Sequence, residues 1–125
     1  KTITFTLPLV MFSLEEELKL PVKPREGPIG MIICPSRELA RQTYDVIQHF
    51  NEYLVKSKYP DLRTLLAIGG ESRRTQMETI EKGFHMVVAT PGRLNDFLNK
   101  RQMDLNICKY ICLCIMTRIS IRHYT

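Results

Sequence analysis

Four short runs of apolar residues stand out along the chain, each separated from the next by a more polar segment. They cover residues 30–34, 64–68, 85–89 and 107–116. The runs are almost uniformly apolar rather than alternating, which is typical of strands covered on both faces in a parallel sheet. The pattern therefore predicts four buried, parallel strands.

Between these runs, apolar residues recur at steps of three and four, as they do on one face of a helix. Such stripes occupy residues 39–54 and 94–98, and a more polar helix is expected over residues 73–82. Ser36 and Thr90 precede the two stripes and are suited to cap the helices, since their hydroxyls can accept from N–H groups of the first turn. Strands that alternate with helices through short connections predict an α/β fold with helices on both faces of the sheet.

The beginning of the chain also has helical periodicity. Pro8 is expected to bend this helix or delay its start, and the glutamates at 15–17 are expected to be solvated. Residues 21–30 are rich in proline and glycine and predict a surface loop. The apolar stripe of the first helix consists of Leu7, Val10, Met11, Leu14 and Leu18.

Composition is that of one ordinary globular domain. The 125 residues are 44% hydrophobic and 25% charged, which excludes disorder along the whole chain. An excess of 18 Lys and Arg over 13 Asp and Glu gives a net charge of +5, compatible with a polyanionic partner. The apolar stretch at 3–12 is too short to span a bilayer and contains Pro8, so no membrane partner is expected.

Cysteine and histidine provide no sign of a metal site. The cysteines form no CxxC pair, have no histidine at ligand spacing and lie in apolar runs, so we expect reduced, buried thiols in an intracellular protein. The three histidines are expected to be structural or surface residues without a specific partner. These residues are Cys34, Cys108, Cys112 and Cys114, and His49, His85 and His123.

The segments that follow the first three predicted strands carry the candidate chemistry. They begin at Pro35, at Gly69 and at Thr90, and should lie along one edge of the sheet, because ligands of parallel sheets gather at the strands' carboxyl ends. Each combines helix-start N–H groups or glycines with a hydroxyl or an arginine, which suits phosphate oxygens, and a row of such sites suits a polymer backbone. Taken singly, the same residues could be helix caps, turn glycines or surface arginines. The candidate residues are Pro35, Ser36, Arg37, Gly69, Gly70, Thr90, Gly92 and Arg93.

With PSRELARQ, Gly-Gly and TPGRLNDFL in this order, the chain resembles the first RecA-like domain of DEAD-box RNA helicases. The sequence around these motifs is similar to that of the Abstrakt member of the family. The resemblance runs from Lys1 to about Leu113 and implies a RecA-like parallel sheet with helices on both faces. It also implies that the candidate residues line an RNA path, with Arg37 and Arg93 on phosphates, so that RNA binds without its sequence being read.

The resemblance also gives meaning to Lys1 and Thr2, which alone are a weak signal. They would complete the loop that holds ATP and Mg²⁺ in the intact parent protein. The family implies a second RecA-like domain in that parent, a nuclear setting, and coupling of ATP hydrolysis to RNA duplex unwinding or RNP remodelling.

The chain departs from the family pattern at both ends. The glycines expected before Lys1 and the strand before them are not in the sequence, and no carboxylate follows Asp104 where the acidic motif should hold Mg²⁺. We therefore expect a truncated helicase domain over residues 1–113 and a divergent tail over 114–125, from a frame or splice artefact. The chain alone is expected to lack catalytic residues and activity, to leave strands unpaired, and to be poorly stable. Two alternatives remain: a weak, sequence-independent RNA-binding module without ATPase activity, or an unstable product without function.

Overall fold

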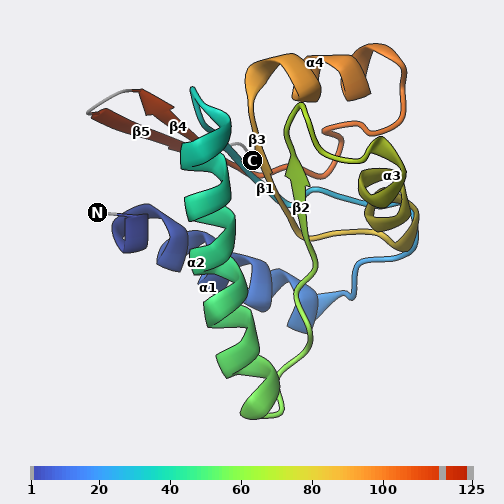
Figure 1. The fold of residues 1–125 in the computed structure, drawn as a ribbon. Helices are drawn as coiled ribbons and strands as arrows, with labels where there is room; N and C mark the ends of the chain where they lie inside the picture. The colour runs from blue at the N-terminus through green and yellow to red at the C-terminus, as the bar shows by residue number, and fades with distance from the viewer. Residues whose placement is uncertain (1, 116–117, 124–125) are drawn as a thin grey trace.

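The computed structural model describes residues 2–115 and 118–123. Within them lies a sheet with the strand order β2-β3-β1-β4-β5 (Figure 1). The first four strands are parallel, as predicted, and β5 pairs antiparallel to β4. The strands are β1 (Gly30–Ile33), β2 (Thr64–Ala67), β3 (Met86–Ala89), β4 (Tyr110–Ile115) and β5 (Arg118–His123).

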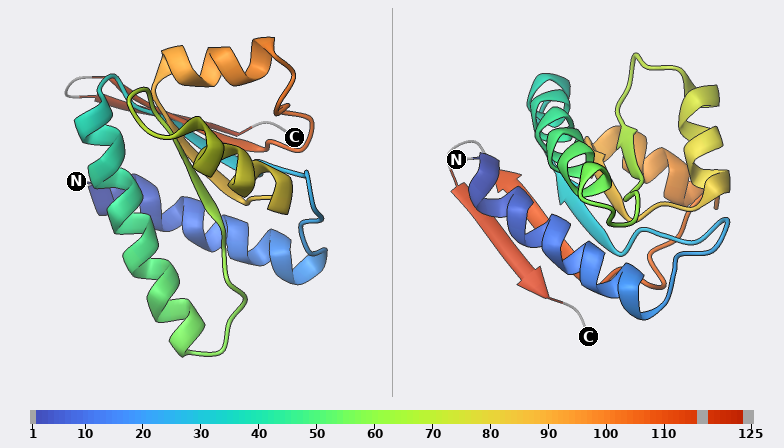
Figure 2. Two further views of the ribbon diagram at one scale, coloured as in Figure 1. Left: turned by 45° about the vertical axis from the view of Figure 1, so that its right-hand side comes forward. Right: turned by 90° about the horizontal axis from the view of Figure 1, so that it is seen from below.

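Helices cover both faces of this sheet, which confirms the predicted α/β architecture (Figure 2). One face packs against α1 and α2, and the other packs against α3 and α4. None of the helices in the described part of the chain is long and apolar enough to cross a bilayer. The helices are α1 (Thr2–Lys19), α2 (Arg37–Lys56), α3 (Arg73–Lys82) and α4 (Pro91–Asn99).

Each face of the sheet has its own hydrophobic cluster. Along β1, Ile32 packs into the cluster under α1 and α2, whereas Met31 and Ile33 face the cluster under α3 and α4. This two-sided burial explains why the strands are uniformly apolar, and each fully buried large side chain contributes about 1.5–3 kcal/mol. The first cluster includes Leu9, Ile47, Met86 and Cys112, and the second includes Leu65, Phe84, Val87 and Phe97.

Helix α1 differs from its prediction in two ways. It begins at Thr2 and continues through Pro8, whose ring lies on an exposed position, so the proline neither delays nor ends the helix. Its predicted stripe was also partly wrong: Val10 and Leu14 are buried, whereas Leu7, Met11 and Leu18 are 41%, 47% and 61% exposed. The reason is that α1 is apolar on nearly all sides, so periodicity does not single out the face that packs. The buried face contains Phe5, Thr6, Leu9, Val10, Ser13 and Leu14.

The end of the chain also differs from its prediction. The fourth strand begins at Tyr110, three residues later than expected, and continues through Cys114 and Ile115. The tail then returns as β5, which aligns Ile121 with Cys112 in register. Strand β4 is therefore paired on both sides, with β1 and β5, whereas unpaired strands had been expected; β2 and β5 are the edge strands of the described sheet.

The four cysteines are free thiols in this structure. Cys34 and Cys112 are fully buried, as predicted, whereas Cys108 and Cys114 are half-buried. Burial raises the pKa of the Cys108 thiol, which keeps that side chain protonated at neutral pH.

Candidate nucleic-acid interface

The carboxyl ends of β1, β2 and β3 open into one hollow of about 550 Å³. It brings together the three segments that were predicted to meet at this edge, and six of the eight predicted residues line it. Pro35 and Ser36 are not among the lining residues; they lie exposed beside the hollow, just before α2. The lining consists of Arg37, Gly69, Gly70, Thr90, Gly92, Arg93 and Asp96.

Arg37 and the glycine turn contact each other directly. The Nη1 group of Arg37 donates to the carbonyl oxygen of Gly69 at 3.4 Å. Gly70 has φ +81°, and a Cβ at this position would lie 2.5 Å from the same Nη1 atom. The backbone conformation therefore favours glycine at 70, whereas the exposed end of the Arg37 side chain could move away from an added Cβ.

The two predicted capping residues behave differently. The Ser36 hydroxyl accepts from the N–H of Leu39 at 3.2 Å and so caps α2. Thr90 occupies the N-cap of α4, but its hydroxyl makes no capping hydrogen bond, and its own N–H donates to the carbonyl of Ala67 at 3.1 Å. Thr90 thus links the ends of β3 and β2 through its backbone, and the residue also lines the hollow.

Arg93 is held by residues that the sequence patterns did not identify. Its Nη1 group donates to Oε1 of Gln76 at 3.0 Å, and its guanidinium lies 5.9 Å from the ring centroid of Phe97. Gln76 in turn donates from Nε2 to the carbonyl of Ile68 at 3.1 Å. The available signal was the position of Gln76 one turn before the buried Ile80, on the face of α3 that packs inward.

Asp96 is the acidic residue of the hollow, and it is already paired. It forms a salt bridge with Arg73, whose guanidinium also lies 5.5 Å from the Phe97 ring. The hydrogen bond from Arg73 holds the pKa of the Asp96 carboxyl below its usual value, so Asp96 stays ionised. Because that charge is paired with Arg73, the cations at 37 and 93 dominate the potential in the hollow.

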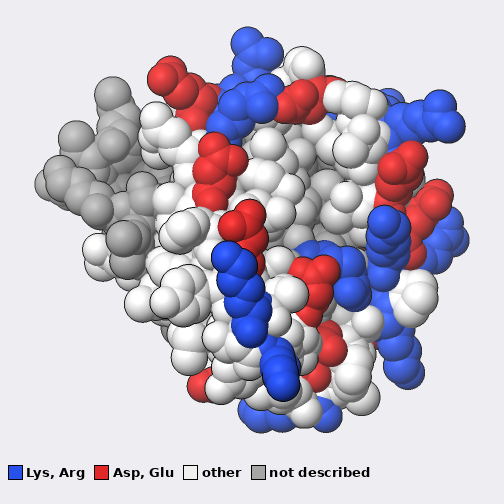
Figure 3. All heavy atoms as spheres, turned by 60° about the horizontal axis from the view of Figure 1, so that its bottom comes forward, with Lys and Arg blue, Asp and Glu red and all other residues white. Residues whose placement is uncertain are grey.

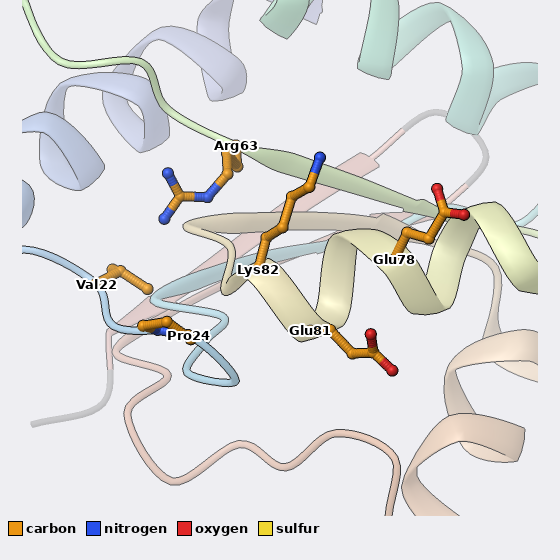
Figure 4. Close-up of a pocket in the computed structure, with 6 residues that line it drawn as sticks. All are labelled: Val22, Pro24, Arg63, Glu78, Glu81 and Lys82. Carbon is orange, nitrogen blue, oxygen red and sulfur yellow. The ribbon is translucent and has the colours of Figure 1, made fainter.

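Two other parts of the described surface carry mixed charges. On the face shown in Figure 3, Lys and Arg side chains are interspersed with Asp and Glu side chains. A wide hollow of about 690 Å³ lies at the other end of the strands, where Arg63 precedes β2 (Figure 4). It sets Arg63 and Lys82 beside Glu78 and Glu81, a mixture of charges that does not suit a polyanion.

The structure describes little of Lys1 and Thr2, the two residues predicted to contact ATP and Mg²⁺. Lys1 is outside the described residues, and of Thr2 only its place at the start of α1 is described. In the part of the chain that the structure describes, no group of three or more His, Cys, Asp or Glu residues could hold a metal ion. No carboxylate follows Asp104 in the sequence, so none lies at the carboxyl end of β4 among the described residues.

A sequence model of the DEAD/DEAH box helicase family matches residues 1–116. The chain belongs to this family. The DEAD-box ATP-dependent RNA helicase 35B of rice, Oryza sativa subsp. japonica, is 56% identical over 113 residues, and the ATP-dependent RNA helicase abstrakt of Drosophila melanogaster is 49% identical over 113 residues. Both matches cover 90% of this chain but only 18% of the relative, so the chain spans about a fifth of the length of the helicases it resembles.

The fold agrees with this membership. The crystal structure of the yeast DEAD-box splicing factor Prp28 superimposes with a TM-score of 0.75 and 28% identity, over 90% of this chain and 25% of that one. The RecA-like fold predicted from the motifs is thereby confirmed, and so is the resemblance to DEAD-box helicases, abstrakt included.

Proposed function

We propose that this chain is part of an ATP-dependent RNA helicase and that its strand-end hollow holds the sugar–phosphate backbone of RNA. The observation that carries the proposal is the convergence of Arg37, Gly70 and Arg93 on one hollow from three separate strand ends. The names of the related helicases support RNA as the polymer.

The chemistry of the hollow suits a phosphate backbone. Guanidinium groups form charge-assisted hydrogen bonds with phosphate oxygens, and the start of α4 adds N–H groups that favour anions. Gly70 and Gly92 leave room for a strand to approach the main chain. Since such contacts reach phosphate and sugar, the lobe would bind RNA without selecting its sequence.

The ATP-dependent part of the function belongs to the whole protein in this proposal. There, ATP and Mg²⁺ would bind a complete phosphate loop, and a second RecA-like domain would close on the RNA, coupling hydrolysis to duplex unwinding or RNP remodelling. This chain alone, without acidic residues after Asp104, is expected to show no ATP turnover above background. RNA-stimulated turnover by the purified chain would overturn this part of the proposal.

Filter binding of a single-stranded RNA of about ten nucleotides tests the hollow. Affinity should be measurable at about 50 mM salt and should fall steeply towards about 200 mM. The Arg37→Ala/Arg93→Ala variant is expected to bind more weakly. Its plot of log affinity against log salt should be shallower by about 1.4, because each lost phosphate contact on a single strand contributes about 0.7.

The Lys23→Ala/Lys56→Ala variant is the matched control. It removes the same amount of positive charge from two exposed positions that do not line the hollow. It should retain the affinity and the salt dependence of the unaltered chain. An equal loss in both double variants would mean that only net charge matters, and the assignment of RNA to this hollow would fail.

A further inference from the structure

Gln76 has a buried polar side chain, 4% exposed, and both the nitrogen and the oxygen of its amide group form hydrogen bonds. Its Nε2 group donates to the carbonyl of Ile68, and its Oε1 atom accepts from Nη1 of Arg93. Ile68 lies between the end of β2 and the glycine turn, so one side chain of α3 joins that turn to the arginine of α4.

This bridge needs a side chain that donates and accepts at once. A carboxamide does both, whereas a carboxylate cannot donate to the Ile68 carbonyl and an aliphatic side chain can do neither. A buried carbonyl that loses its hydrogen-bond donor destabilises the folded chain, so few side chains other than glutamine suit position 76. Without this hydrogen bond, the long Arg93 side chain would still contact the Phe97 ring but would lose its partner on α3.

The bridge also connects the two arginines of the hollow. Arg37 donates to the carbonyl of Gly69, the residue directly after Ile68. Two hydrogen-bonded links therefore start at adjacent residues of the backbone: one leads from Gly69 to Arg37, and the other leads from Ile68 through Gln76 to Arg93. The link through the buried Gln76 gives the Arg93 guanidinium a defined partner before any polymer arrives.

We propose that Gln76 is a positioning residue for nucleic-acid binding, acting through Arg93 rather than by touching the polymer. The proposal rests on the function proposed for the hollow. Binding gains from this arrangement because the guanidinium is already ordered, so less conformational entropy is lost when a phosphate binds.

The test combines a double-mutant cycle with a spectroscopic measurement on the full chain. Gln76→Leu should weaken binding of the same single-stranded RNA by roughly fivefold, the effect of one ordinary hydrogen bond. In an Arg93→Ala background, the same substitution should weaken binding by less than about 1.5-fold, because the residue through which it acts is gone. In NMR spectra without RNA, the guanidinium signals of Arg93 should broaden or shift in Gln76→Leu as the side chain gains freedom.

Gln48→Leu is the control, because Gln48 is a half-buried glutamine of α2 with no hydrogen-bond partner on its Oε1 atom and no link to the hollow. It should change neither the affinity nor the Arg93 signals. Equal losses for Gln76→Leu with and without Arg93 would overturn the inference, as would unchanged Arg93 signals. If Arg93→Ala itself binds normally, the proposed function of the hollow fails, and the NMR comparison still decides whether Gln76 orders Arg93.

If the Gln76→Leu variant does not fold, as judged by the lack of a cooperative thermal transition, the Gln76→Glu variant is used in the same binding assay. The carboxylate keeps the shape and accepts from Arg93, but it neutralises that cation and repels the Ile68 carbonyl. RNA affinity should then fall at least as far as in the Leu variant. Affinity equal to that of the unaltered chain would contradict the positioning role.

Discussion

Nε2 of His85 lies 2.6 Å from Oε1 of Glu17, joining residues that are 68 positions apart in the chain. His85 is completely buried, and its Nδ1 atom accepts from the backbone N–H of Arg63 at 3.0 Å. The proton of the neutral ring must therefore be on Nε2, from which it is donated to Glu17. The sequence had predicted no specific partner for His85 and a solvated Glu17, and both predictions were wrong.

The burial of His85 against Glu17 predicts that the folded chain becomes less stable in acid. Burial lowers the pKa of His85 more than Glu17 raises it, so the folded chain keeps the ring neutral while the unfolded chain takes up a proton below about pH 6.5. The free energy of unfolding should be highest above about pH 7. It should fall as the pH drops below about 6.5, by at most about 1.4 kcal/mol per pH unit from this group.

Urea denaturation between about pH 7.5 and pH 5.5 measures that dependence. The His85→Gln variant should show a flatter profile, whereas the exposed control His49→Gln should keep the profile of the unaltered chain. An identical decline in His85→Gln would assign the acid sensitivity to other groups.

Glu17 is expected to stabilise the fold directly. It accepts from His85 and from the N–H of Val22 at 3.0 Å; although burial alone would raise its pKa, these hydrogen bonds lower the pKa overall. The contribution of the carboxylate should be present above about pH 4.5 and lost as the pH falls through its lowered pKa. At neutral pH, Glu17→Ala should reduce the free energy of unfolding by about 1–3 kcal/mol, since two donors lose their acceptor. Glu15→Ala, an exposed neighbour on α1, should change it by less than about 0.5 kcal/mol, and equal effects would contradict this role.

The glycine turn provides a third test. Gly70→Ala should destabilise the chain by about 1–2 kcal/mol, because an alanine would have to adopt a positive φ. At Gly69 an added Cβ meets nothing within 4 Å, so Gly69→Ala should be neutral or stabilising by up to about 1 kcal/mol. Thermal denaturation of the two variants side by side measures the difference, and equal midpoints would rule out strain at position 70.

Pairing of β5 with β4 predicts a role for the divergent tail in solubility. Removing residues 116–125 would expose the edge of β4, and unpaired edges of apolar strands promote association between molecules. Light scattering should detect larger aggregates than the full chain forms at the same concentration. Removing only residues 124–125 leaves β5 in place and should have no effect, whereas a monodisperse 1–115 chain would contradict the prediction.

Much of the fold was predictable because its strands are buried on both faces. Uniformly apolar runs such as residues 86–89 have few structural alternatives, and Ser36 and Thr90 both lie at the N-cap positions that the pattern assigned to them. The buried face of α1 was not predictable in the same way, because residues on most sides of that helix are apolar. For β5, the alternation of Ile119 and Ile121 was a strand signal that the loss of family pattern obscured.

The sequence by itself determined the four parallel strands, most of the helices, and the meeting of three motif segments at one edge of the sheet. These features follow from local periodicity and from the rule that carboxyl ends of parallel strands lie together. Only the tertiary structure decided which side chains pair: Gln76 with Arg93 and Arg37 with the glycine turn at the site, and Glu17 with His85 away from it. The physical reason is that such bonds depend on distances of about 3 Å between distant segments, which periodicity along the chain does not encode.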